Sequence, residues 1–274
     1  MRITAQRFGE MPEDGYSLFI SLHGGGNAPT QLNDSQWQNQ WYLYKPAEGL
    51  YICPRAPYDD WDMHFKPLLD DLYHELILFA VTHYKVNPDK VYILGYSAGG
   101  DGVWRLAPRM ADTWAAASMM AGHPGDVSLV NLRNTPFMVW CGALDAAYDR
   151  NKKCKERIVE LDSLRKADPE GYIHEGHIVA GKPHWMDQVD TVAISWMAQY
   201  KRNPYPTNIV WRQEEVLHPY FYWIGVDKDE MKRGMEVRLK VEKNNIRISQ
   251  SDYKHITLYL NDEIVDLDKP VTVY

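Results

Sequence analysis

Apolar runs that match strands alternate with segments of helical period over roughly the first 200 residues. Six runs are mostly continuous and apolar: 16–24, 49–56, 90–97, 114–122, 136–142 and 171–179. Continuous runs are typical of parallel strands that are covered on both faces. Four helices are expected between or after them, at 65–84, 98–110, 151–167 and 186–200. This alternation predicts an α/β fold with a doubly wound, mostly parallel sheet.

The helix expected at 65–84 shows its period most clearly. Five apolar residues recur at helical spacing and are predicted to form its inward stripe: Leu68, Leu69, Leu72, Leu76 and Phe79.

The pattern changes at "KRNPYPTN", residues 201–208, where two prolines and two asparagines end the last helix. We therefore expect a larger α/β domain at 1–202 and a small β-rich module at 203–274. The runs 209–213, 220–226, 236–242, 245–250 and 256–260 are short and alternate, which indicates antiparallel strands. Asn244–Asn245 is the expected hairpin turn, and 261–263 is expected to form another. The final "PVTVY" still follows a strand pattern, so this module could be truncated.

Composition excludes several classes of function. The formal net charge is -7 and acidic and basic residues are interspersed, so no basic face for nucleic acid is indicated. No apolar run approaches the roughly 20 residues of a membrane span. Cys53, Cys141 and Cys154 lack the spacing of a zinc site, and we expect neither metal nor cofactor. The first ten residues lack a signal-peptide core, so the sequence as given indicates a cytoplasmic protein. A trimmed N-terminus would leave secretion or a periplasmic location open, and the oligomeric state is not indicated.

The segment "GYSAG", residues 95–99, matches G-x-S-x-G and falls between an expected strand and an expected helix. In that context the serine occupies a sharp turn, the nucleophile elbow, which exposes its hydroxyl. Side chains at Gly95 and Gly99 would collide with the neighbours of such a turn. Ser97 is therefore the candidate nucleophile.

Three glycines follow the first predicted central strand, in "HGGGN" at 23–27. Acyl transfer places negative charge on the former carbonyl oxygen, and backbone N–H groups free of side chains can approach and stabilise it. We expect Gly24 and Gly25, together with Ala98 of the elbow, to form this oxyanion hole. The loop lacks the G-K-[ST] ending of a phosphate-binding loop.

A serine hydroxyl needs a base that is oriented by an acid, and in this arrangement the acid precedes the base in the chain. Asp145 follows the strand of 136–142 directly and is the preferred acid, with Asp149 as its rival. His184 lies between the last strand and the last helix of the first domain and is the preferred base. The other histidines that follow Asp145 are weaker alternatives: His174, His177, His218 and His255.

The motifs "HGGGN", "GYSAGGDG", "CGALD" and "GKPHW", in this order, resemble those of α/β-hydrolases over residues 10–200. The most similar members are esterases related to polyhydroxybutyrate depolymerases and feruloyl esterases. The resemblance implies a Ser97–Asp145–His184 triad. The family usually has further strands before the glycine loop, whereas here 22 residues leave room for two. The β module resembles an appendage of some bacterial members.

The residues that shape the pocket are less marked in the sequence. Trp61, His64, Tyr96 and His123 follow strands at the same edge and are the candidates for substrate binding. The expected activity is hydrolysis of small or carbohydrate-linked esters. Two alternatives remain: a peptidase of the prolyl-oligopeptidase type, whose propeller repeat is not seen here, and an inactive hydrolase-like binding protein.

Overall fold

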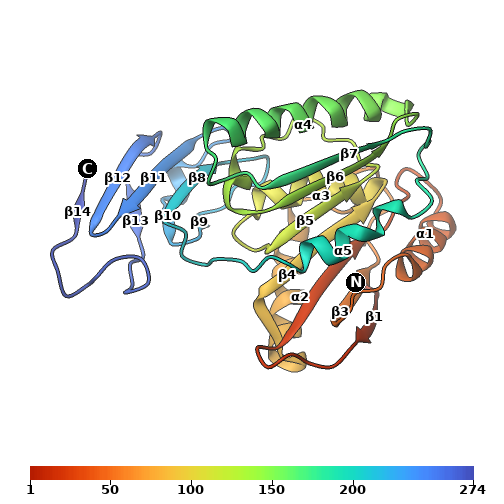
Figure 1. Ribbon diagram of the computed structural model, residues 1–274, viewed down its shortest axis with the longest axis horizontal. Coiled ribbons are helices and arrows are strands. Elements are labelled where there is room, and N and C mark those ends of the chain that lie inside the picture. The colour runs from red at the N-terminus through yellow and green to blue at the C-terminus, as the bar shows by residue number, and fades with distance from the viewer.

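A seven-stranded sheet lies at the centre of the first 200 residues in the computed structural model, which describes residues 1–274 (Figure 1). Its strand order is β1-β3-β2-β4-β5-β6-β7, and only the pairing of β1 with β3 is antiparallel. The strands are β1 (Ile3–Phe8), β2 (Tyr16–Leu22), β3 (Gly49–Pro54), β4 (Val86–Tyr96), β5 (Ala116–Met120), β6 (Phe137–Gly142) and β7 (His174–Val179). Every residue of β2, β3, β5 and β6 is buried, which explains their continuous apolar runs. The predicted fold class is confirmed.

Helices cover both faces of this sheet. One face packs against α2 (Leu68–Tyr84), α3 (Ala98–Arg109) and α4 (Arg150–Ala167), and the other against α1 (Thr30–Leu43) and α5 (Val192–Met197). Four short 3₁₀ helices complete the chain: η1 (Val130–Asn134), η2 (Ala147–Asp149), η3 (Val189–Thr191) and η4 (Lys228–Glu230). None of the helices combines the length and the apolar character that crossing a membrane requires. The two-sided cover leaves the strand ends as the place where loops can gather.

Helix α1 departs from the sequence prediction, which placed no helix at 30–43. Its buried residues are Asn33, Trp37 and Gln40, spaced as one helical face but mostly polar. The side chain of Gln40 donates to the Ser21 hydroxyl, so burial is satisfied by hydrogen bonds rather than by apolar contact. A search for apolar periodicity therefore misses this helix. The last helix of this part is also shorter than predicted, because 186–200 contains only η3 and α5.

The inward stripe of α2 is rotated from the one predicted. Leu69 is buried as expected, and Leu72 and Leu76 pack partly against the core, but Leu68 and Phe79 are 59% and 51% exposed. The face that the helix buries includes Tyr73 and Ala80 instead. Adjacent leucines at 68 and 69 lie 100° apart on a helix, so only one of them can face the sheet.

From Asn208 onward the chain forms two smaller sheets, which lie to one side of the large one (Figure 1). One has the order β14-β12-β11-β8, in which only β14 is parallel to its neighbour, and the other is β13-β10-β9. The strands are β8 (Asn208–Arg212), β9 (Tyr220–Phe221), β10 (Ile224–Val226), β11 (Glu236–Glu242), β12 (Asn245–Ser251), β13 (Ile256–Leu258) and β14 (Thr272–Val273). Val237, Leu239 and Val241 are buried in their core, as their alternation predicts.

Two turns in this module differ from the prediction. The run 220–226 is two strands, because the chain reverses at Tyr222, which has a positive φ of 52°. The hairpin between β11 and β12 pairs Glu242 with Asn245, so its turn residues are Lys243 and Asn244, one position earlier than expected. Lys243, with a φ of 57°, takes the left-handed conformation there. The tight turn predicted at 261–263 is present, where the N–H of Ile264 donates to the Asn261 carbonyl.

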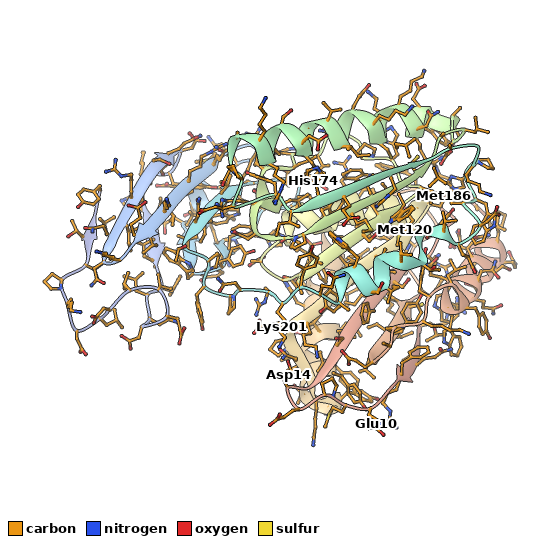
Figure 2. All side chains as sticks on the ribbon, in the orientation of Figure 1. Glu10, Asp14, Met120, His174, Met186 and Lys201 are labelled. Atoms are coloured by element: carbon orange, nitrogen blue, oxygen red, sulfur yellow. The ribbon has the colours of Figure 1, made fainter.

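The module is joined to the larger part by polar contacts. Buried Asp70 accepts one hydrogen bond from Arg109 and, at 2.9 Å, pairs with His218 of the module. Where the chain leaves the large sheet, Lys201 is paired with Asp14 at 2.6 Å (Figure 2). Among the buried residues of the module's core, Ala111 is the one from outside 203–274. The division into domains at 202/203 remains a prediction, since this arrangement does not show that either part folds alone.

Candidate active site

Ser97 sits in a sharp turn between the end of β4 and the start of α3. Its backbone has φ 59° and ψ -119°, outside the favoured regions for a residue with a side chain. The two glycines of the motif make the turn sterically feasible: a Cβ on Gly95 would lie 2.3 Å from the Gly99 carbonyl oxygen, and one on Gly99 would lie 2.0 Å from the Leu22 oxygen. The turn thus holds the Ser97 hydroxyl above the end of the sheet.

Two further loops meet Ser97 at the same edge of the sheet. Asp145 follows β6, and His184 follows β7. Gly142, the last residue of β6, lets these loops touch, because a Cβ there would lie 2.0 Å from the Pro183 carbonyl oxygen. The N–H of Leu144 also donates to the Lys182 carbonyl at 2.9 Å. These contacts fix the two loops to each other.

The three side chains form one hydrogen-bonded chain. His184 Nδ1 is 2.7 Å from Asp145 Oδ2, and His184 Nε2 is 2.9 Å from Ser97 Oγ. Asp145 is almost fully buried, whereas the His184 side chain is 42% exposed. Since a carboxylate only accepts, a neutral imidazole donates through Nδ1 and leaves Nε2 free to accept the serine proton. This arrangement can activate the hydroxyl for attack.

Tyr96 holds the loop that carries His184 in place. Its hydroxyl donates to the His184 carbonyl at 2.7 Å and accepts the Met186 N–H at 3.1 Å. Figure 2 places Met186 at the end of the sheet away from the C-terminal module. Tyr96 was predicted as a substrate-binding residue, and the structure gives it a positioning contact in addition to a place in a pocket wall.

The glycine loop after β2 lies directly beside Ser97. A Cβ on Gly24 would be 3.3 Å from the Ser97 Cβ, and Gly25 has a φ of 116° that favours glycine. The N–H of Gly26 donates to Asn33 at 2.9 Å, whereas no protein group accepts the N–H of Gly24 or Gly25. Ala98 is the first residue of α3, so its N–H has no partner within the helix. The three expected oxyanion donors are therefore close to the serine and uncommitted.

His23, the first residue of this loop, has a structural role. Its Nε2 accepts the Ala56 N–H at 3.1 Å, and its Nδ1 donates to the Gly24 carbonyl at 2.6 Å. Burial lowers the pKa of His23 to about 4, so the ring stays neutral and keeps both bonds at neutral pH. His23 thereby anchors the backbone of the glycine loop.

The rival residues lie elsewhere. Asp149 is at the surface and pairs with Lys152 at 2.7 Å. His174 pairs with Asp162, and His177 stacks on Trp140 with ring centroids 4.0 Å apart. His218 faces Asp70, and His255 faces Glu230. The structure brings none of them to Ser97.

Two pockets lie along the glycine loop beside the serine. The larger, of about 680 Å³, contains Ser97 and His184 in its wall, together with Gln36 and Tyr42 of α1 and Trp185. The smaller, of about 340 Å³, shares Gly25 and Gly26 with it and extends past Ala98. No residue of 203–274 lines either pocket.

Of the remaining predicted pocket residues, two line the smaller pocket and one lines neither pocket. Trp61 and His123 line the smaller pocket. His64 lines neither pocket; it is buried behind the glycine loop, with Nε2 2.7 Å from the His23 carbonyl oxygen. The sequence placed it after a strand at the correct edge but could not show that its ring turns inward. Burial lowers the pKa of His64, and the neutral ring donates to His23.

Several pocket residues were not found from the sequence. Asp101, Arg105, Tyr148 and Arg150 line the smaller pocket. Asp101 lies within the segment "GYSAGGDG" but was not assigned a role, and the other three belong to no recognisable motif. Burial raises the pKa of Asp101 to about 6, although its Oδ1 accepts the His123 N–H at 2.6 Å. The N-terminal position of Arg150 on α4, just after the Asp145 loop, is the one signal that could have pointed to this residue.

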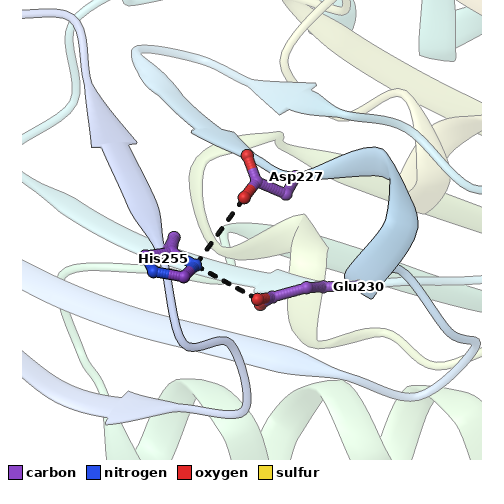
Figure 3. A group of neighbouring side chains, drawn as sticks. All are labelled: Asp227, Glu230 and His255. Atoms are coloured by element: carbon purple, nitrogen blue, oxygen red, sulfur yellow. Dashed lines mark hydrogen bonds and ion pairs between the residues drawn. The ribbon is translucent and has the colours of Figure 1, made fainter.

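One group outside these pockets has side chains that could hold a metal ion: Asp227, Glu230 and His255 (Figure 3). His255 Nδ1 is 3.2 Å from Glu230 and 3.7 Å from Asp227, and the imidazole is 72% exposed. Glu230 also accepts the Lys254 N–H at 2.9 Å. These hydrogen bonds and ion pairs account for the grouping without an ion.

Comparisons with known proteins identify the fold. No family model matches the sequence, and no curated protein is similar enough in sequence to count as a relative. Among solved structures, esterase PE8 is similar over 73% of this chain and 100% of its own, with 16% identity and a TM-score of 0.50. A thermostable esterase is similar over 73% of this chain, with 21% identity and a TM-score of 0.52. This chain covers 59% of that esterase's length.

The chain therefore has the α/β-hydrolase fold, as the order of its sequence motifs implies. Two strands precede the glycine loop, which fits the space available in the sequence, and β1 closes the edge of the sheet as an antiparallel strand.

Proposed function

We propose that this protein is a serine hydrolase that cleaves carboxylic esters through an acyl-enzyme on Ser97. One observation carries the proposal: the unbroken chain from the Ser97 hydroxyl through His184 to the buried carboxylate of Asp145. The fold shared with solved esterases supports the same chemistry. No step of this chemistry needs a metal or cofactor.

In the first half of the reaction, Ser97 Oγ attacks the ester carbonyl carbon while His184 Nε2 accepts the hydroxyl proton. Asp145 holds the ring with Nδ1–H toward itself and stabilises the positive charge that the imidazole gains. The carbonyl oxygen becomes an oxyanion, which the N–H of Ala98 and that of Gly24 or Gly25 stabilise. The C–O bond to the alcohol then breaks, and the alcohol leaves with the proton from Nε2.

In the second half, water attacks the acyl-enzyme and gives one proton to His184 Nε2. The Ser97–acyl bond breaks, Ser97 regains the proton, and the carboxylic acid is released. The two pockets, which share Gly25 and Gly26, provide separate space for the acyl and alcohol parts of a small or carbohydrate-linked ester.

The direct test compares the parent protein with Ser97→Ala on p-nitrophenyl acetate. We expect the substitution to lower kcat on the order of 10⁶-fold, because the nucleophile itself is removed. Hydrolysis by Ser97→Ala at the parental rate would overturn the assignment.

A second measurement defines the class of bond that is cleaved. We expect cleavage of p-nitrophenyl esters and of acetylated or feruloylated sugars in an ester panel, and little cleavage of matched aminoacyl p-nitroanilides. Preference for the anilides would favour a peptidase instead.

A further inference from the structure

Arg150, the first residue of α4, is a nearly buried cation without a hydrogen-bond acceptor. Its side chain is 11% exposed, and no protein group accepts from its guanidinium. The Nε atom is fully buried and unpartnered. The nearest carboxylate oxygen, Asp145 Oδ1, is 3.8 Å from Nη1, which is too long for a hydrogen bond. Leaving buried donors of a charged group unpaired is costly, so an acceptor from outside the protein fits here.

The guanidinium lines the smaller pocket, which reaches the proposed oxyanion donor Ala98. The other charged residues of this pocket already have partners. Arg105 donates to Asp126 at 2.8 Å, and Asp101 accepts the His123 N–H. Arg150 is therefore the one charged residue of this pocket whose side chain makes no hydrogen bond to the protein.

The charged residues that line the pocket are two arginines, Arg105 and Arg150, and one acid, Asp101. After burial, four positive side chains lower the pKa of His123 at the pocket wall: Arg150, Lys153, Arg105 and Arg157. These positive side chains favour an anion in the pocket.

The position of Arg150 is fixed by a strained segment. Tyr148 and Asp149 both have positive φ, 55° and 57°, although neither is glycine. This conformation places the Tyr148 ring 5.0 Å from the guanidinium, as in a cation–π contact. Strained residues persist where the surrounding structure holds them, and they concentrate at binding sites.

We propose that the smaller pocket binds a carboxylate carried by the ester substrate, with Arg150 as its ligand. The preferred substrates are then esters whose acyl or alcohol part ends in a carboxylate, such as half-esters of short dicarboxylic acids. A guanidinium matches a carboxylate with two parallel N–H···O bonds. This inference rests on the proposed function, since the pocket shares Gly25 and Gly26 with the pocket that contains Ser97.

The experiment compares two pairs of esters that differ in one charge: monomethyl glutarate with methyl pentanoate, and 4-acetoxybutanoate with butyl acetate. Acid release is followed by titration. We expect the parent to prefer the charged ester in at least one pair, and Arg150→Gln to lower that ratio of kcat/KM values about 10- to 100-fold. Arg150→Lys, which keeps the charge but loses the paired donors, should lower it less.

Lys166→Gln provides the matched control, because it removes one positive charge from the last turn of the same helix, where the side chain is exposed. Its ratio should stay within twofold of the parental one. If Arg150→Gln lowers both members of a pair equally, the arginine acts only through Asp145 and the proposal is overturned. A parent without preference for the charged ester overturns it as well.

Direct binding separates this inference from the proposed function. In calorimetry, glutarate should bind Ser97→Ala protein and pentane-1,5-diol should not, and adding Arg150→Gln should weaken glutarate binding at least tenfold. If the parent cleaves no ester, the proposed function fails, and glutarate binding alone decides the assignment of the pocket. Equal binding with and without Arg150 would overturn it.

Discussion

An imidazole faces a carboxylate in both parts of the molecule, but in very different surroundings. His184 Nδ1 is 2.7 Å from Oδ2 of the buried Asp145, and His184 Nε2 contacts Ser97 Oγ. His255 is 3.2 Å from Glu230 in the C-terminal module, where the imidazole is largely exposed and Nε2 has no hydrogen-bond partner (Figure 3). Both sites contain the residue types of acid–base chemistry.

The difference teaches what a candidate triad needs beyond those residue types. Burial of the acid strengthens its interaction with the imidazole, because water no longer screens the charges. The free nitrogen needs a nucleophile, and the nucleophile needs donors for the developing oxyanion. Only the edge of the large sheet supplies all three, through the loops after β2, β4, β6 and β7.

The largest expected effect comes from making the same substitution in both places. His184→Ala should lower kcat for p-nitrophenyl acetate on the order of 10⁶-fold, because the base is lost. His255→Ala should leave kcat within twofold. Comparable losses in the two variants would mean that the module takes part in the reaction.

The acids give the next contrast. Asp145→Asn should lower kcat about 10⁴-fold, because an amide no longer holds the imidazole in the required tautomer. Asp149→Asn and Glu230→Gln serve as controls and should change kcat by less than twofold. A large loss in Asp149→Asn with an active Asp145→Asn would exchange the roles of the two aspartates.

A smaller effect is expected from the glycine loop. Gly25→Ala should lower kcat about 10²-fold, because the new Cβ would lie 2.1 Å from Asn33 Oδ1 and displace the loop that holds the proposed oxyanion donors. Gly234→Ala in the module also introduces a side chain at a positive φ, but its nearest neighbour is a flexible Arg212 side chain at 3.3 Å. That control should lose stability without losing kcat.

The smallest effect concerns stability against pH. Burial raises the pKa of Asp101 from 3.8 to about 6, so between these values the folded protein keeps a proton that the unfolded chain releases. This contribution stabilises the fold at low pH and is lost as pH rises through about 6. The free energy of unfolding of Asp101→Asn, measured with urea, should therefore rise relative to that of the parent by on the order of 2 kcal/mol between pH 4 and pH 7.

The contribution of Glu230 to stability should change with pH in the opposite direction. Its pKa is lowered, first by the hydrogen bond from the Lys254 N–H, so its contribution is present above the unfolded pKa and lost as pH falls. Glu230→Gln should lose stability relative to the parent as pH rises past 4.5. Parallel pH profiles for the two variants would contradict this account of both groups.

The parts that the sequence predicts well are those where one physical requirement dominates. Continuous apolar runs give the buried strands, and the Gly95–Gly99 segment needs small residues for a tight turn. The order of the motifs also placed Ser97, Asp145 and His184 just after three different strands. Their distances could not be predicted, because these depend on how Gly142 lets two loops touch.

The parts that it misses are held by specific polar contacts. Helix α1 buries Asn33 and Gln40 through hydrogen bonds, which leaves no apolar stripe to detect. His64 turns inward to the His23 carbonyl, and Arg150 turns into a pocket next to a strained turn. Such orientations depend on contacts between segments distant in the chain, which local patterns do not encode.

Labelling with a fluorophosphonate, followed by peptide mass spectrometry, tests the central claim most directly, because the reagent reacts with an activated serine. We predict one adduct per chain, on Ser97, formed by the parent and by His255→Ala but not by His184→Ala. No adduct in the parent, or an adduct on another residue, would contradict the account.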